Sequence, residues 1–272
     1  MHRKKPIRKK RRYVGKIIGL ILFLFLIAGL AYFLFFSSFL MIKEINISVD
    51  KSVIESKALE IIHRNLDGKK IGLISQKNII LAPIEKIKAN ILEISPEIES
   101  VFINKKMPSL LEVNILEHQN VGVWCEAKKD TATSTPKISQ CFNIDKNGVI
   151  FKESPLISGS LILTIYDLRN KSDSLHTKIK NIVASTEMIN FIIEVKKTLA
   201  SDSNIKIDNF EIISENDLIV KTNEGWLIYF DSHSSIKEQT ESLEAVLSEL
   251  VKESRKSLEY VDLRINGRVY YK

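Results

Sequence analysis

The sequence of 272 residues is poor in glycine, proline and cysteine, with ten, six and two of them respectively. So few glycines and prolines exclude a long flexible linker or a low-complexity tract, because such segments are rich in these residues. The chain also lacks an internal repeat. We therefore expect folded segments joined by short connections.

Residue patterns that would support catalysis or metal binding are missing as well. No glycine-rich phosphate loop and no paired catalytic carboxylates are present. The five histidines do not show a metal-ligand spacing such as His-x-x-x-His; they are His2, His63, His118, His176 and His233. We therefore expect no catalytic residue, no metal ion, no cofactor and no small-molecule substrate.

Two short polar clusters nevertheless contain residue types found in catalytic sites. Asp231, Ser232 and His233 include all three members of a hydrolase triad. Adjacent residues on an extended chain point to opposite sides, so they cannot form the relay from base to nucleophile. A polar turn before a helix is the better interpretation. By the same argument, we interpret Glu117 and His118 as a solvated strand end rather than as an acid–base pair.

Four other residues have a structural and a functional interpretation. Lys105 and Lys106 are expected to lie in a solvated turn, with an acidic ligand as the alternative. Trp124 and Trp226 are expected to be core or edge aromatics rather than a ligand platform.

Positive charge is concentrated at the start of the chain. The formal net charge is +7, from 40 Lys and Arg against 33 Asp and Glu, and residues 1–16 carry nine of the bases and no acid. Without those nine, 31 bases face 33 acids, so the rest of the chain is nearly neutral. A nucleic-acid-binding body would need a basic patch there. The composition therefore argues against a nucleic-acid partner.

Residues 17–40 form a run of 24 residues without a charge, dominated by Leu, Ile and Phe. About 20 apolar residues suffice for a helix to cross a bilayer. A cleaved signal peptide would have a shorter apolar core and small residues at its cleavage site. We therefore predict a retained transmembrane helix. The basic residues 1–16 should stay in the cytoplasm, which places the remaining chain of about 230 residues outside.

The next segment, residues 41–119, has the pattern of two helices and three strands. Ser52 and Glu55 form a capping box at the start of the first helix, and Pro83 suits the first turn of the second. Alternating apolar residues predict the strands. The expected order is a strand at 42–49, a helix ending at Asp67-Gly68, a helix from Ala82-Pro83 to before Pro96, and strands at 98–105 and 110–116. A small sheet covered by two helices would bury the apolar faces.

From residue 120 onward the pattern is rich in strands. Ser235 and Glu238 form a second capping box, which opens a long amphipathic helix. The turn at 145–148 ends in Asn-Gly, which predicts a β-hairpin between 141–144 and 149–152. Further elements are expected as strands at 121–125, 161–165, 210–213, 218–221, 226–230, 260–265 and 269–271, and a helix at 188–199.

Cys125 and Cys141 are the only cysteines, and they flank a polar insertion at residues 126–140. Outside the cytoplasm a disulfide between them would persist. It would close a loop of about 15 residues, worth roughly 3 kcal/mol in the chain-entropy model. Two reduced, half-buried thiols are the alternative, and the sequence leaves both open.

Several motifs, taken in order, resemble the FtsQ/DivIB family of bacterial cell-division proteins. Residues 105–124 contain Lys-x-x-Pro followed by a strand, and residues 145–151 match the Asp-x-x-Gly-x-x-Phe hairpin of the family. Residues 260–264 resemble its penultimate signature. The chain differs at His118, Gln119 and Asn120, where the family usually has Arg with Pro nearby. The residues that carry the resemblance are Lys105, Pro108, Leu111, Val113, Glu117, Val121, Trp124, Asp145, Gly148, Phe151, Pro155, Gly159, Tyr260, Val261, Asp262, Leu263 and Arg264.

The resemblance implies an α+β architecture behind a single transmembrane helix. Its expected parts are a basic cytoplasmic tail at 1–16, the transmembrane helix at 17–40, a POTRA domain (β-α-α-β-β) at 41–119, and an FtsQ-type β domain at 120–272. The last part would be a larger mixed β domain with an antiparallel sheet and flanking helices.

The resemblance also implies a non-enzymatic protein of the divisome in the cytoplasmic membrane at the division septum. Its expected partners are membrane-anchored division proteins, FtsB/DivIC-like and FtsL-like, and it would link early and late components. Strand addition at an exposed sheet edge suits such binding. By the family, the edge is the last strand, here Leu263, Arg264, Ile265, Val269 and Tyr271. The alternative is that these residues only complete the hydrophobic core. This core interpretation is stronger for Leu263 than for Arg264.

Two other functions remain as alternatives. A POTRA-bearing export or assembly factor fits the small domain, but no transmembrane β-barrel pattern follows it. A membrane-anchored wall hydrolase fits the location, but it would need a catalytic site.

Overall fold

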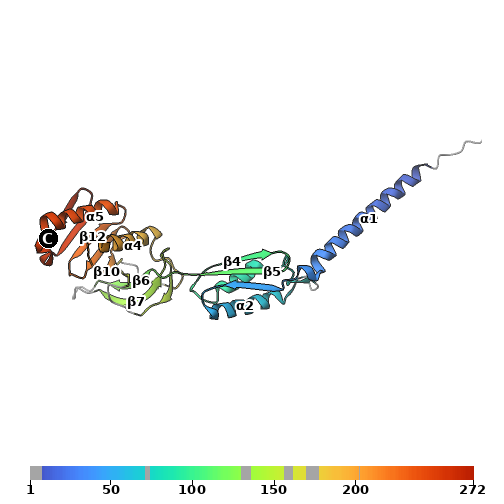
Figure 1. The fold of residues 1–272 in the computed structure, drawn as a ribbon, viewed down its shortest axis with the longest axis horizontal. Coiled ribbons are helices and arrows are strands. Elements are labelled where there is room, and N and C mark those ends of the chain that lie inside the picture. Colours follow the sequence, from blue (N-terminus) through green and yellow to red (C-terminus); the bar gives the residue numbers. More distant parts are fainter. Residues whose placement is uncertain (1–7, 71–73, 130–135, 156–161, 170–177, 202) are drawn as a thin grey trace, which may run out of the picture. The chain divides into compact units, whose positions relative to one another are not determined.

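The computed structural model describes residues 8–70, 74–129, 136–155, 162–169, 178–201 and 203–272. The chain divides into two compact units, Met1–Glu117 and His118–Lys272. A long apolar helix opens the first unit, and both units combine helices with sheets (Figure 1). The expected α+β fold behind one apolar helix is confirmed.

Helix α1 (Arg8–Phe36) contains the apolar segment Gly15–Phe36. Its 22 residues extend about 33 Å at 1.5 Å per residue, enough for the hydrocarbon core of a bilayer. The helix ends four residues before the expected end at Leu40. The Ser37 side chain accepts a hydrogen bond from the backbone N–H of Phe39 and begins a short 3-10 helix, η1 (Ser38–Leu40). Leu40 is buried rather than exposed to lipid.

The rest of the first unit is a three-stranded sheet with two helices, in the expected POTRA order. Its elements are β1 (Glu44–Ser48), α2 (Ser52–Leu66), α3 (Ile84–Leu92), β4 (Ile98–Lys106) and β5 (Leu110–Glu117), with a small hairpin of β2 (Lys69–Lys70) and β3 (Ile74–Ser75) between the helices. The strand order is β1-β5-β4, with β1 parallel and β4 antiparallel to β5. The apolar faces of α2, α3 and the sheet form one core.

The first capping box differs from its expected form. Helix α2 begins at Ser52, so Lys51 occupies the N-cap position, and no side-chain cap is formed. The Lys51 carbonyl instead accepts from the backbone N–H groups of Ile54 and Glu55. The Lys51 ammonium pairs with Glu97 and Glu117, and these hydrogen bonds raise its pKa.

The second unit is built on a nine-stranded sheet, with order β14-β13-β12-β11-β10-β9-β6-β7-β8 among the described residues. Five neighbouring pairs are antiparallel, as expected, and three are parallel. Two parallel pairs arise where a helix joins the strands, since parallel neighbours need a crossover connection. The strands are β6 (Gly122–Lys128), β7 (Lys137–Ile144), β8 (Ile150–Glu153), β9 (Thr164–Asp167), β10 (Ile207–Ile212), β11 (Asp217–Thr222), β12 (Leu227–Asp231), β13 (Tyr260–Ile265) and β14 (Arg268–Tyr271).

The helices α4 (Thr186–Ser201) and α5 (Ile236–Ala245) lie along the same side of this sheet (Figure 1). Helix α5 continues as a π-helical turn, η2 (Val246–Val251), and a 3-10 segment, η3 (Lys252–Ser257). Trp124 and Trp226 are fully buried in the large core between helices and sheet. Both tryptophans are therefore core residues, as expected.

The polar insertion at residues 126–140 is shorter than expected. Strand β6 continues to Lys128 and β7 begins at Lys137, so the insertion is largely an extension of this hairpin; residues 130–135 lie outside the described part. Cys125 and Cys141 are direct partners in the β6–β7 register, and the structure joins them in a disulfide.

Candidate partner-binding edge

The large sheet has two edges, β8 and β14, and they differ in cover. Beside β8, Ile150 donates to the Asn181 carbonyl at 3.1 Å and accepts from Lys180 N–H at 2.7 Å. Val183 N–H donates to the Gly148 carbonyl at 2.9 Å. Residues 180–183 therefore occupy part of this edge. On the outer side of β14, no strand is paired within the part of the chain that the structure describes.

Strand β14 is the second arm of a hairpin with β13, joined by a turn at Asn266-Gly267. Tyr260 and Lys272 exchange hydrogen bonds through their backbone N–H and carbonyl groups. In an antiparallel ladder such pairs alternate, so Lys272 and Tyr270 bond inward and Tyr271 and Val269 direct their backbone groups outward. An added strand would find its backbone partners at these two residues.

The β13–β14 hairpin places the five residues predicted for partner binding in different environments. Leu263 is buried in the core, so for this residue the core interpretation is correct. Strand β13 lies inside the sheet between β12 and β14, because the hairpin turn makes β14 the edge. Val269 is half-buried against the core. Ile265 is 51% exposed and Tyr271 is 46% exposed. Tyr270, which was not among the predicted residues, is 47% exposed.

Arg264 is held by neighbouring side chains rather than presented to solvent. Its Nε and Nη2 donate to the two carboxylate oxygens of Asp262 at 2.9 and 2.7 Å, and its Nη1 lies 3.4 Å from Asp217 Oδ1. The guanidinium also lies over the Tyr229 ring, 5.0 Å from the centroid. Burial opposes ionisation of Asp262, but the hydrogen bonds from Arg264 outweigh it and lower the pKa of Asp262. Arg264 therefore fixes the inner strand of the hairpin.

Helix α5 packs against strand β13 of the hairpin, and its residue Gln239 forms hydrogen bonds to the backbone of the sheet. Gln239 Oε1 accepts from Asp231 N–H at 3.0 Å, and its Nε2 donates to the Asp231 carbonyl at 2.9 Å. The buried Gln239 amide thus bonds the backbone of Asp231 at the end of β12. Asp231 lies beyond Tyr229, which is the last residue of β12 that pairs with β13. Sequence reasoning missed Gln239, because a single Gln on a helix carries no distinctive signal.

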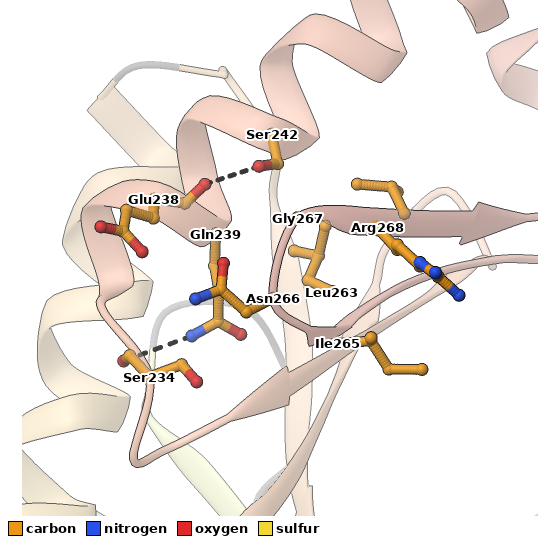
Figure 2. A pocket seen from close by; sticks show the side chains of 10 residues that line it. Ser234, Glu238, Gln239, Ser242, Leu263, Ile265, Asn266, Gly267 and Arg268 are labelled. Atoms are coloured by element: carbon orange, nitrogen blue, oxygen red, sulfur yellow. Dashed lines mark hydrogen bonds between the residues drawn. The ribbon is translucent and has the colours of Figure 1, made fainter.

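A pocket of about 30 Å³ lies between α5 and the hairpin, lined by Gln239, Leu263, Ile265 and Arg268 among others. This volume admits a water molecule rather than a metabolite. In Figure 2 Ile265 and Arg268 point away from α5. The edge therefore offers an extended surface, suited to a polypeptide.

The polar clusters singled out in the sequence have structural roles. Asp231 accepts from His233 N–H and from Ser234 Oγ, which forms the expected turn before the Ser235 cap of α5. Lys105 donates to the Ile80 carbonyl at 3.0 Å, and Lys106 pairs with Glu112 at 2.6 Å. Among the described residues, no group of three His, Cys, Asp or Glu is placed to hold a metal ion.

Comparison with known proteins identifies a similar cell-division protein. No family model matches the sequence. Over 194 residues, which are 71% of this chain and 71% of the relative, the chain is 26% identical to the cell division protein DivIB of Clostridium acetobutylicum. This similarity confirms the resemblance to the FtsQ/DivIB family that the motifs indicate.

Proposed function

We propose that this chain is a non-enzymatic, single-pass membrane protein of the division machinery, which binds other membrane-anchored division proteins through β14. The similarity to the DivIB protein of Clostridium acetobutylicum supports the role in cell division. The candidate span Gly15–Phe36 supports membrane anchoring. The nine bases in residues 1–16 favour an N-terminus in the cytoplasm, with both folded units outside. The protein would act at the septum and link early and late components.

The observation that carries this proposal is the difference between the two edges of the large sheet. An uncovered edge strand is a liability unless it is short, charged or occupied by a partner. Strand β8 is partly covered and ends in the exposed Lys152 and Glu153, whereas β14 exposes Tyr270 and Tyr271. Aromatic anchors of this kind carry much of the binding energy in many interfaces.

The mechanism is strand addition. A partner strand would bond the outward backbone groups of Val269 and Tyr271, which gives affinity, while side chains on the two faces select the sequence. Tyr270 lies beside Asp262 and Tyr271 beside Val261, so the two tyrosines present different faces to the partner. FtsB/DivIC-like and FtsL-like proteins are the expected partners. No cofactor takes part in such binding.

The test is a double variant, Ile265→Glu with Tyr271→Ala, in the full chain. Pull-down of the membrane-anchored partners should fall about 30-fold or more, which corresponds to a loss of 2 kcal/mol. The melting temperature of the double variant should match that of the natural chain, because both of the replaced side chains are exposed. The control is Ile193→Glu on α4, an exposed isoleucine in the same unit.

Two results would contradict the proposal. A double variant that melts normally and still captures its partners would place the binding surface elsewhere. A variant that no longer folds would support the core interpretation of these residues instead. For orientation, a reporter active only outside the cytoplasm and fused after Lys272 should be active; activity confined to the cytoplasm would contradict the topology.

A further inference from the structure

Within the first unit, a buried asparagine in the loop before α3 forms a hydrogen bond to the C-terminal end of α1. Asn78 Nδ2 donates to the Leu34 carbonyl at 2.7 Å, and Asn78 is almost fully buried. Leu34 lies in the last turn of α1, where helix carbonyls lack an intrahelical partner. Asn78 Oδ1 accepts from Ile80 N–H at 2.9 Å, and Ile79 N–H donates to the Leu40 carbonyl at 2.8 Å. The loop before α3 is thus bonded to the end of the span.

This contact determines the depth of the loop relative to the bilayer. Leu34 precedes the end of the apolar segment at Phe36 by two residues, or about 3 Å along the helix axis. A segment of this length matches the hydrocarbon core closely. Asn78, and Ile80 two residues later, must therefore lie at the boundary between hydrocarbon and headgroups.

Several apolar side chains are exposed at this end. Ile80 is 43% exposed and Phe39 56%, and the Phe39 ring stacks against Phe33 of α1 with centroids 6.3 Å apart. Met107, at the turn between β4 and β5, is also exposed. Lys105, near the end of β4 and just before this turn, bonds the Ile80 carbonyl, which brings the turn to this end. Exposed cations follow or precede these residues in the chain: Lys43, Lys77 and Lys106.

We propose that the membrane-proximal end of the first unit, formed by Phe39, Ile80 and Met107, is embedded in the headgroup region of the bilayer that holds α1. Apolar and aromatic side chains flanked by lysines are typical of segments that lie in this interface. The surface is continuous with the apolar span through Asn78 and Leu34. It therefore meets lipid whichever side of the membrane the unit occupies, and this inference does not depend on the proposed partner binding.

A lipid surface fits this patch better than a protein partner does. The hydrogen bond to Leu34 fixes the height of the loop without any second protein. Two of the cations, Lys77 and Lys106, already pair with Asp67 and Glu112, so the apolar side chains are the main contacts on offer. Such side chains would stand in water if the unit were held away from the membrane.

The experiment measures depth in the bilayer with an environment-sensitive fluorophore. Ile80→Cys and Phe39→Cys are introduced separately into the full chain, in which both native cysteines are in a disulfide and do not react. Each labelled protein is reconstituted in nanodiscs of phosphatidylethanolamine and phosphatidylglycerol that contain a doxyl-labelled lipid. The matched control is Val53→Cys, an exposed apolar position at the start of α2, beyond the far end of β1.

Lipid quenching of the Ile80 and Phe39 labels should exceed that of the Val53 label roughly twofold or more, because interfacial side chains lie about 5–10 Å into the headgroup boundary. Iodide in the water should quench the Val53 label most. Equal lipid quenching at all three positions would overturn the proposal. Protection of the Ile80 label in cell membranes but not in nanodiscs would assign the surface to a protein partner, and would overturn it as well.

Discussion

His118 and Asp145 form a buried pair in the second unit, with His118 Nδ1 2.7 Å from Asp145 Oδ2 and both side chains less than a tenth exposed. The His118 ring also stacks on Phe151, with centroids 5.1 Å apart. Asp145 Oδ1 accepts from the backbone N–H groups of Asn147 and Val149, so the pair holds the hairpin turn. The expectation of a solvated strand end at His118 is wrong, because the hairpin folds over this residue.

His118→Ala should lower the free energy of unfolding of the second unit by about 1–3 kcal/mol, since the buried Asp145 carboxylate loses its partner. Urea unfolding followed by tryptophan fluorescence measures this unit alone, because Trp124 and Trp226 are the only tryptophans. The control is His233→Ala, at an exposed position. Equal midpoints for the two variants would contradict the role of His118.

Gly148→Ala should destabilise the same unit strongly. Gly148 has φ +76°, and an added Cβ would lie 1.9 Å from the Ala184 carbonyl oxygen, so the backbone would have to move. We expect a loss on the order of 3 kcal/mol or more. Gly225 also has a positive φ, +99°, but has open space around it. Gly225→Ala should cost about 1 kcal/mol from conformation alone. Similar losses in the two variants would show that the contact with Ala184 is unimportant.

Local signals in the sequence predicted much of the fold. The Asn147-Gly148 turn gave the β7–β8 hairpin, and the Ser235 cap is formed, with Ser235 Oγ accepting from Glu238 N–H. The cap at Ser52 is not, because the helix begins at Ser52 itself and leaves Lys51 in the cap position. A one-residue shift of a helix end depends on tertiary contacts, which a local pattern does not contain.

The sheet edge proposed for partner binding was predicted only in part. Alternating apolar residues indicate a strand at 260–265, but not which strands flank it. The turn at Asn266-Gly267, where Gly267 has φ +72°, is a hairpin signal that would have separated the inner strand from the outer one. The parallel pairing of β12 with β13 depends on α5 crossing over the sheet. The structural role of Arg264 also required the fold, because Asp217 is 47 residues away in sequence.

The disulfide between Cys125 and Cys141 should contribute to the stability of the second unit. It links residues 16 apart, and the chain-entropy model gives about 3 kcal/mol for such a loop. Cys125→Ala with Cys141→Ala should therefore unfold at lower urea concentration. Mass spectrometry after alkylation without reductant tests the bond directly in the natural protein. Modification of both thiols would contradict it.

Arg264→Ala should destabilise the second unit by about 1–2 kcal/mol, because the half-buried Asp262 loses its charge-assisted hydrogen bonds. Arg264→Lys should recover only part of this, since an ammonium cannot bond both carboxylate oxygens as the planar fork does. Ile265→Glu should leave unfolding unchanged. If Arg264→Ala melts normally and loses partner binding instead, Arg264 belongs to the interface.

The raised pKa of Glu211 predicts that the stability of the second unit depends on pH. It lies on β10 between Tyr166 of β9 and Ile219 of β11, and burial raises its pKa above the ordinary value of 4.5, although Lys221 and Lys129 partly oppose this. The folded state therefore binds the proton more tightly than the unfolded state. The stability that proton binding by Glu211 contributes is fully present below pH 4.5, and it is lost as the pH rises through the folded-state pKa.

As the pH rises toward neutral, ionisation of Glu211 costs the folded protein more than the unfolded chain, because burial disfavours the charged carboxylate. Glu211→Gln removes that cost, so the variant should melt on the order of 2 °C higher at pH 7. Below pH 4.5 the difference from the natural chain should shrink toward zero, because the natural side chain is then neutral as well. Thermal melts at several pH values, followed by tryptophan fluorescence, measure this, with the exposed Glu215→Gln as control. A stabilisation that is equal at all pH values would have to come from packing rather than from the charge of Glu211.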